Sequence, residues 1–147
     1  MKIRPYRTTD YPAVLHILSD NVPRYFAPEE VSDLADYLRY EREDYFVVEE
    51  EERMVGSGGI NYLPDWSTAV LSWGFLHPDF QRRGIGRRLA EHRIEHIKGQ
   101  NEYIKIRVRT SQLTWLFYQK LGFTLLETQR DYWAKGYDLY HMEMKLP

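Results

Sequence analysis

The chain has 147 residues, of which 43% are hydrophobic and 15% aromatic, so we expect one domain over residues 1–147 with a single core. It contains no cysteine, which excludes disulfides, thiolate metal sites and any mechanism that carries a substrate group on a thiol. The formal net charge of -2 gives no reason to expect attraction to nucleic acid, and no apolar run approaches the roughly 20 residues that span a bilayer, so we expect a cytoplasmic protein.

The N-terminal part is predicted to form a strand at 3–7 followed by two helices. Asp10 followed by Pro12 is typical of a helix start, because proline is tolerated in the first helical turn. The second helix opens at 28–30, and its apolar residues follow the i, i+3, i+4, i+7 spacing of one buried face. Its other face is acidic; we interpret it as a solvated face that could also attract a cationic amine.

Three strands are predicted next, at 45–48, 54–62 and 69–76, with the first two joined as a hairpin. Glycines at 56, 58 and 59 weaken the second of these strands and indicate either a bulge or a place where another backbone or a ligand approaches closely. The third strand stops before Pro78, since proline cannot donate to a sheet ladder.

The C-terminal half begins with a helix to about Lys98, whose apolar arc contains Arg93, and we expect the stem of Arg93 to run outward to solvent. The remaining elements are a strand at 103–109, a helix at 112–121 and two strands at 123–127 and 139–146. The last two strands are separated by an aromatic loop with Tyr132, Trp133 and Tyr137, which would form a core lid, an interface patch or a substrate wall. The order βααβββαβαββ predicts an α/β fold, a mixed sheet with helices on both faces.

The most specific motif joins the strand at 69–76 to the following helix. It consists of Gln81, Arg82, Arg83, Gly84, Ile85, Gly86 and Arg87. Backbone N–H groups at such a helix start are unpaired, so a pyrophosphate can bind there. The glycines let a phosphate approach the main chain, and the arginines supply charge-assisted contacts. The alternative interpretation is an ordinary basic turn.

This loop, at 81–86, resembles the acetyl-CoA pyrophosphate motif of the GNAT N-acetyltransferases. A second segment, FYQKLGF at 117–123, is similar to another block of that family, and the order of elements matches over nearly the whole chain. The resemblance implies acetyl-CoA as cosubstrate, no metal, and direct transfer of the acetyl group to a primary amine of a small molecule or a protein. Dimers are common in the family, and the aromatic loop would permit a homodimer.

The resemblance also implies roles for single residues. Tyr118 would hydrogen-bond the cofactor sulfur and act as general acid for the departing thiolate, since a phenol has a pKa of about 10, similar to that of the thiolate. A backbone N–H near Phe75 or Leu76 would polarise the thioester carbonyl. Ser111 stands where many members carry a cofactor-contacting asparagine, and Thr114 replaces a common alanine.

Helical spacing predicts the orientation of Tyr118 independently of the family resemblance. The apolar stripe predicted for its helix consists of Leu113, Leu116, Phe117 and Leu121. Tyr118 lies about 60° beyond the edge of that stripe. We therefore expect its hydroxyl to face a ligand, although aromatic side chains on helices usually belong to the core.

No single residue is predicted as the general base. The strand positions where many relatives carry a glutamate hold Val70, Leu71, Ile106 and Arg107. The titratable options are Glu49, Asp65, His77 and His16. Each of them is better explained as a solvated or turn residue, and a water chain or an amine that arrives neutral would need none of them.

Two other hypotheses stay open. A non-catalytic domain that binds acyl-CoA would explain the absent glutamate. A nucleotide-binding protein could use the same helix start, but the chain lacks a Walker lysine-serine pair. His92 and His96 are four residues apart without further ligands, so they predict a surface pair and no metal site.

Overall fold

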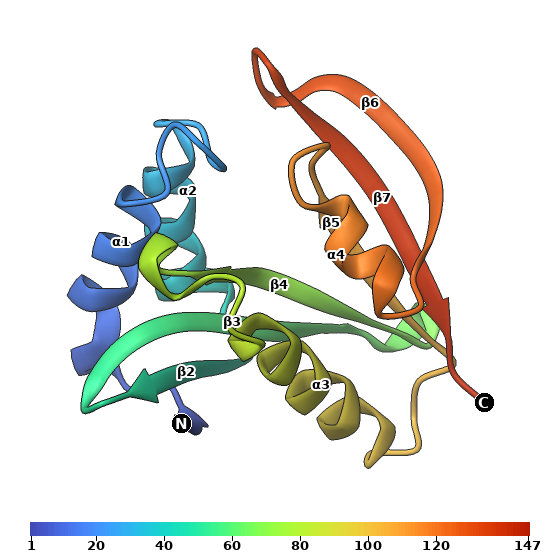
Figure 1. Ribbon diagram of the computed structural model, residues 1–147. Coiled ribbons are helices and arrows are strands. Elements are labelled where there is room, and N and C mark those ends of the chain that lie inside the picture. Colours follow the sequence, from blue (N-terminus) through green and yellow to red (C-terminus); the bar gives the residue numbers. More distant parts are fainter.

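The computed structural model describes residues 1–147, and its sheet contains seven strands (Figure 1). They are β1 (Lys2–Pro5), β2 (Asp44–Glu50), β3 (Arg53–Leu63), β4 (Thr68–Leu76), β5 (Lys105–Thr110), β6 (Thr124–Ala134) and β7 (Tyr137–Lys145). Their order across the sheet is β1-β2-β3-β4-β5-β7-β6. Only β4 and β5 run parallel. The predicted mixed sheet is therefore confirmed.

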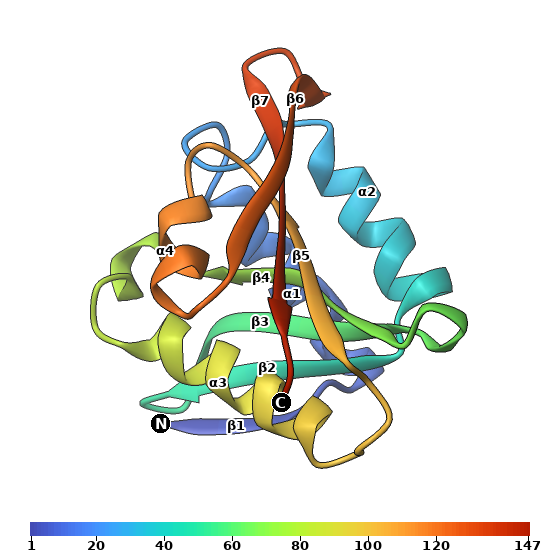
Figure 2. The ribbon, with the colours of Figure 1, turned by 90° about the vertical axis from the view of Figure 1, so that its right-hand side faces the viewer.

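Helices cover both faces of this sheet, as predicted. They are α1 (Tyr11–Ser19), α2 (Glu30–Asp36), α3 (Ile85–Lys98) and α4 (Trp115–Lys120). Figures 1 and 2 show α1 and α2 on one face and α3 on the other. Each face has its own buried cluster, one of 9 residues under α1 and α2 and one of 16 under α3 and α4. None of the helices combines the length and apolar composition that a bilayer crossing requires.

A partly buried ionic cluster ties β1 to the start of α1. The guanidinium of Arg4 donates to both carboxylate oxygens of Asp10, each over 2.9 Å, and also pairs with Glu49 of β2. Asp10 also accepts the backbone N–H of Arg7 over 2.7 Å. Because these donors favour the charged form, with the Arg4 hydrogen bonds as the main cause, they hold the pKa of Asp10 below its usual range.

Replacing Asp10 with asparagine should lower the free energy of unfolding by about 1–3 kcal/mol at neutral pH, since it leaves the Arg4 guanidinium half-paired. A lowered carboxyl pKa stabilises the fold above the ordinary aspartate pKa, and this stabilisation is lost as the pH falls through the lowered value. Urea unfolding of both proteins between about pH 7 and pH 3 should show the difference shrinking on acidification. A difference in the free energy of unfolding that stays constant over this pH range would contradict the lowered pKa of Asp10.

Several predicted boundaries are wrong. The first strand ends at Pro5 and the last helix is only Trp115–Lys120, because residues 112–114 form a turn. The segment predicted as an aromatic loop is mostly strand, since β6 continues to Ala134 and β7 starts at Tyr137. The aromatic residues therefore lie at the end of a long hairpin that rises above the rest of the sheet (Figure 2).

The expectation that Arg93 reaches solvent is also wrong, because its side chain is only 2% exposed. Its guanidinium lies against Gly58 of β3 and Gly74 of β4. A Cβ at Gly74 would stand 2.7 Å from Nη2 of Arg93. The glycines of β3 mark both predicted features, since the ladder to β4 is irregular at Gly58 and a Cβ at Gly56 or Gly59 would stand 2.9 Å from a backbone oxygen of a neighbouring strand. At Gly58 the approaching group is this guanidinium, which the sequence did not predict.

Candidate active site

The glycine loop has the geometry of an anion site at the start of α3. The first intrahelical hydrogen bond runs from the N–H of Arg88 to the oxygen of Gly84 over 3.2 Å, so the N–H groups of Ile85, Gly86 and Arg87 have no intrahelical acceptor. Gly84 has a φ of 80°, which favours glycine, and a Cβ added there would meet no atom within 4 Å. The space above Gly84 is therefore open to a ligand group.

The arginines of this loop differ in their placement. Arg82 and Arg87 are exposed and line a large cavity beside the loop. Nε of Arg87 also pairs with Glu91 over 2.9 Å. Arg83 lies over the ring of Phe80, 4.8 Å from its centroid, and turns away from that cavity. Ile85 is a core residue, so only its backbone is available to a ligand. Arg82 and Arg87 therefore provide the charge on the cavity side.

A cavity of about 880 Å³ runs from the glycine loop between α4 and β4 to the helices on the opposite face. The predicted site residues that line it are Phe75, Leu76, Gln81, Arg82, Gly84, Gly86, Arg87, Ser111 and Tyr118. The fold thus brings together nine of the predicted residues and leaves out the side chains of Arg83 and Ile85.

The cavity exists because β4 and β5 part. Their parallel pairing begins at Thr68 with Lys105 and ends at Leu71 with Val108, so the later residues of β4 have no strand partner on that side. At the same place β4 contains a bulge, since Trp73 and Gly74 both lie opposite Gly58 of β3. Trp73 has a φ of 46° there, a strained value for an aromatic residue, and such strain is typical of functional sites.

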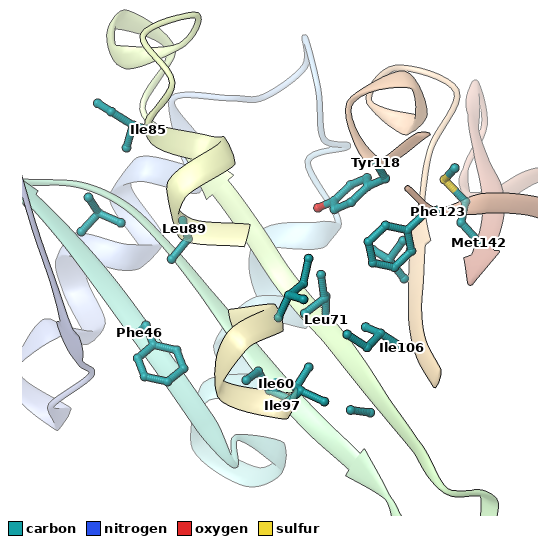
Figure 3. Packing of buried hydrophobic residues seen from close by; sticks show 14 of the residues in the cluster. Phe46, Ile60, Leu71, Ile85, Leu89, Ile97, Ile106, Tyr118, Phe123 and Met142 are labelled. Atoms are coloured by element: carbon teal, nitrogen blue, oxygen red, sulfur yellow. The ribbon is translucent and has the colours of Figure 1, made fainter. Parts of the chain in front are cut away.

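Tyr118 enters the cavity from α4. Of the apolar stripe predicted for this helix only Leu121 packs against the core, so the burial predicted for the other three residues is wrong. Tyr118 is 8% exposed, whereas Leu113, Leu116 and Phe117 are 36% to 53% exposed and line the cavity. The prediction failed because α4 covers the parted strands, where its apolar side faces the cavity. Figure 3 shows the hydroxyl oxygen of Tyr118 pointing toward α3 and away from Phe123 and Met142.

The turn before α4 is held by its own polar groups. Oγ of Ser111 accepts the N–H of Leu113 over 3.2 Å, and the oxygen of Ser111 accepts the N–H groups of Thr114 and Trp115. The hydroxyls of Thr110 and Thr114 lie 2.5 Å apart. Ser111 lines the cavity with a hydroxyl that is already engaged as an acceptor, so it can still donate to a ligand.

The end of the cavity beneath α1 and α2 is aromatic and acidic. Trp73 stacks with Phe26 at 6.3 Å and lies beside Tyr37. The acidic side chains are Glu30 and Glu41, and both line this cavity. The β6–β7 hairpin closes its edge, where the Tyr137 hydroxyl donates to the oxygen of Pro23 over 2.6 Å and Trp133 also lines the wall.

None of the four titratable side chains considered as a general base lines this cavity. Glu49 is paired with Arg4, and Asp65 is exposed in a short turn. His16 is exposed, and His77 lies 3.3 Å from Asp20. The carboxyl group that the sequence interpretation missed is Glu30, which was assigned to a solvated helix face and is 5% exposed. Its signal was its position at a helix start, where it accepts the N–H of Ala27 over 2.8 Å.

Replacing Glu30 with glutamine should raise the thermal midpoint at pH 7. Burial is the main cause that raises the pKa of Glu30, so ionisation favours the unfolded chain. A raised carboxyl pKa leaves its stabilisation intact below the ordinary glutamate pKa and loses it as the pH rises through the raised value. The advantage of the variant should therefore disappear near pH 4. The exposed neighbour Glu29→Gln is the control, and a Glu30 variant that melts below the wild type at pH 7 would contradict this expectation.

No group of three or more His, Asp or Glu side chains is arranged to hold a metal ion. His92 and His96 both pack edge-on against Phe46, and His96 also lies 3.4 Å from Asp44. Burial lowers the pKa of His92, with a smaller effect of His96. These contacts hold both imidazole rings against β2.

The chain is similar in sequence and fold to known acetyltransferases. Residues 11–123 match the family model described as the acetyltransferase (GNAT) family. The chain is 30% identical over 164 residues to an N-alpha-acetyltransferase of Sulfurisphaera tokodaii, covering 99% of this chain and 93% of that protein. It is 31% identical over 115 residues to the human cysteine-rich protein 2-binding protein, covering 77% of this chain but spanning only 14% of that protein. It also shares its fold with an aminoglycoside 6'-N-acetyltransferase complexed with coenzyme A, at a TM-score of 0.78 and 13% identity, covering 100% and 98% of the two chains.

Proposed function

Because the chain belongs to the acetyltransferase (GNAT) family, we propose that it transfers the acetyl group of acetyl-CoA to a primary amine while both are bound. The observation that carries this proposal is the continuous cavity from the glycine loop past Tyr118 to the acidic end beneath α1 and α2. Direct transfer requires that both substrates share one cavity. The absence of cysteine agrees with it, since no thiol is present to hold the acetyl group.

The residues of the cavity fit acetyl-CoA. The free N–H groups at the start of α3 and the side chains of Arg82 and Arg87 would hold the pyrophosphate. The exposed apolar side chains of Leu116 and Phe117 would cover the pantetheine arm. Acetyl-CoA supplies the acetyl group as an activated thioester. The edge of β4 that β5 leaves unpaired would offer backbone N–H groups to its carbonyl, near the predicted Phe75 and Leu76.

The acidic end of the cavity would bind the amine. Glu30 and Glu41 favour a cationic acceptor, and the aromatic ring of Trp73 offers an apolar wall. Burial raises the pKa of Glu30, which makes its carboxylate a stronger base toward an ammonium group. The relative named N-alpha-acetyltransferase favours an α-amino group as the acceptor.

Tyr118 would serve as general acid at the other end of the reaction. The amine attacks the thioester carbon, the carbon–sulfur bond breaks, and the electron pair passes to sulfur. The phenol of Tyr118 then gives its proton to this sulfur, which yields free CoA. The proton lost by the amine balances the one given to CoA.

A second candidate function is an acyl-CoA-binding domain without turnover. The observation that favours it is the absence of a glutamate on the strands at Val70, Leu71, Ile106 and Arg107. Such a domain would bind acetyl-CoA through the same loop and release no CoA. The cytoplasmic location, the homodimer and the absence of a nucleic-acid partner stay predictions.

Initial rates at varied concentrations of acetyl-CoA and of an amine test direct transfer. Double-reciprocal lines should intersect, because both substrates must be bound before CoA leaves. Parallel lines would indicate an acetylated enzyme and contradict the proposed mechanism. A panel of peptides with free or blocked N-termini, beside small diamines and aminoglycosides, would identify the acceptor class.

A further inference from the structure

Arg93 is the largest fully buried side chain of the protein and has no assigned role in the reaction above. It projects from α3 one turn after Leu89, into the sheet face at the bulge of β4. Two glycines make room for it, since a Cβ at Gly58 would stand 2.9 Å from its Cζ and one at Gly74 would stand 2.7 Å from its Nη2. The sheet therefore has a space shaped for a guanidinium.

The charge of Arg93 has no counterion. Its Nη1 donates to the backbone oxygen of Gly59 over 3.2 Å, while Nε is buried without any acceptor. No carboxylate lies within ion-pair distance of it. Burial lowers the pKa of Arg93, and the nearby hydroxyls of Tyr118 and Tyr45 oppose this effect, yet a guanidinium keeps its proton in proteins. Buried charges are normally paired, so this unpaired guanidinium is available to an anion that forms beside it.

Arg93 lies where such an anion would form. It lines the same cavity as Tyr118, at the point where β4 has left β5. The hydroxyl of Tyr118 points toward α3, the helix that carries Arg93 (Figure 3). The Tyr45 hydroxyl on the opposite side is held by Ser57 and by the oxygen of Trp73, each over 3.0 Å. The Tyr37 hydroxyl, a third neighbour that also lines this cavity, donates to Oδ1 of Asn61 over 2.6 Å. Tyr118 is therefore the neighbouring phenol that is free to exchange its proton with a ligand.

We propose that Arg93 is a positioning residue that stabilises the phenolate of Tyr118 after this tyrosine has protonated the CoA sulfur. The inference rests on the proposed function, in which Tyr118 is the general acid. The carbon–sulfur bond breaks, the proton of Tyr118 moves to sulfur, and the negative charge that stays on the phenol oxygen faces the guanidinium. The proton released by the acetylated amine then restores the phenol. Arg93 would thus stabilise the negative charge that the proton transfer leaves on the phenol oxygen.

Turnover of Arg93→Met, Arg93→Lys and the control Lys98→Met gives the first test. Lys98 is an exposed cation on the same helix, paired only with Glu95. The Met variant should lose about 10-fold to 100-fold in kcat with KM for acetyl-CoA nearly unchanged. Arg93→Lys should recover part of the loss, and Lys98→Met should match the wild type. The thermal midpoint of Arg93→Met should not fall, because an unpaired buried charge is removed.

A spectroscopic titration tests the same inference without turnover. Tyrosine ionisation is followed by its ultraviolet absorbance as the pH rises. The wild-type curve minus the Tyr118→Phe curve gives the ionisation of Tyr118 alone. When both proteins also carry Arg93→Met, this difference curve should shift to higher pH. An unchanged difference titration, or equal kcat for Arg93→Met and wild type, would overturn the inference.

The measurements distinguish failure of the proposed function from failure of the role of Arg93. Absence of amine-dependent CoA release by the wild type would reject the transferase itself. A large loss in Tyr118→Phe together with full activity in Arg93→Met would reject only the role of Arg93. If the two residues act as a pair, the double variant should be little worse than Tyr118→Phe alone.

Discussion

Tyr118→Phe should lower kcat by about 100-fold or more, because general acid catalysis by a positioned side chain contributes roughly that much. The ring of Tyr118 packs against Phe123, so the fold should tolerate loss of the hydroxyl alone. KM for acetyl-CoA should change little, since the proton is needed only as the thiolate departs. Steady-state kinetics of CoA release measures both constants.

The control for this variant is Tyr40→Phe, which removes a hydroxyl from a side chain that is 80% exposed and outside the cavity. It should match the wild type. A Tyr118→Phe enzyme with full kcat would show that solvent or another group protonates the sulfur. That result would also remove the basis for the role of Arg93.

Gly84→Glu should abolish the stabilisation that acetyl-CoA gives to the wild type. A ligand at about 100 times its dissociation constant adds roughly 2.7 kcal/mol to the free energy of unfolding. The variant places a carboxylate in the open space above the helix start, where it would repel and displace the pyrophosphate. Thermal unfolding with and without acetyl-CoA measures the difference.

Gly136→Glu is a matched control for this variant. Gly136 also has a positive φ, of 85°, and open space at its Cβ position, but it lies in the β6–β7 turn. Both variants therefore carry the same kind of backbone strain. An acetyl-CoA shift that survives in Gly84→Glu as well as in Gly136→Glu would place the pyrophosphate elsewhere.

The order of elements and the anion loop could be predicted from the sequence because their signals are local. The free N–H groups are specified without any distant contact by a strand that stops before Pro78, glycines at 84 and 86, and a following helix. The family prediction, the mixed sheet and the expectation of an acetyltransferase are confirmed by comparison. The roles of the single site residues stay predictions.

The other parts of the site depend on contacts between distant segments. The burial of Arg93 requires that two glycines of β3 and β4 meet α3, and periodicity along α3 cannot show this. The exposure of Leu113 and Leu116 follows from the parting of β4 and β5 beneath α4. A hydrophobic stripe on a helix predicts a partner surface, but it does not distinguish a protein core from a cavity that a ligand fills.

The most direct test of the central claim is a mass measurement after the wild-type protein has been mixed with acetyl-CoA and a pool of primary amines. We expect an acceptor whose mass rises by one acetyl group, with an equal amount of free CoA, and neither product when the amines are blocked. Binding of acetyl-CoA without any acetylated amine or free CoA would contradict the transferase and favour the acyl-CoA-binding domain.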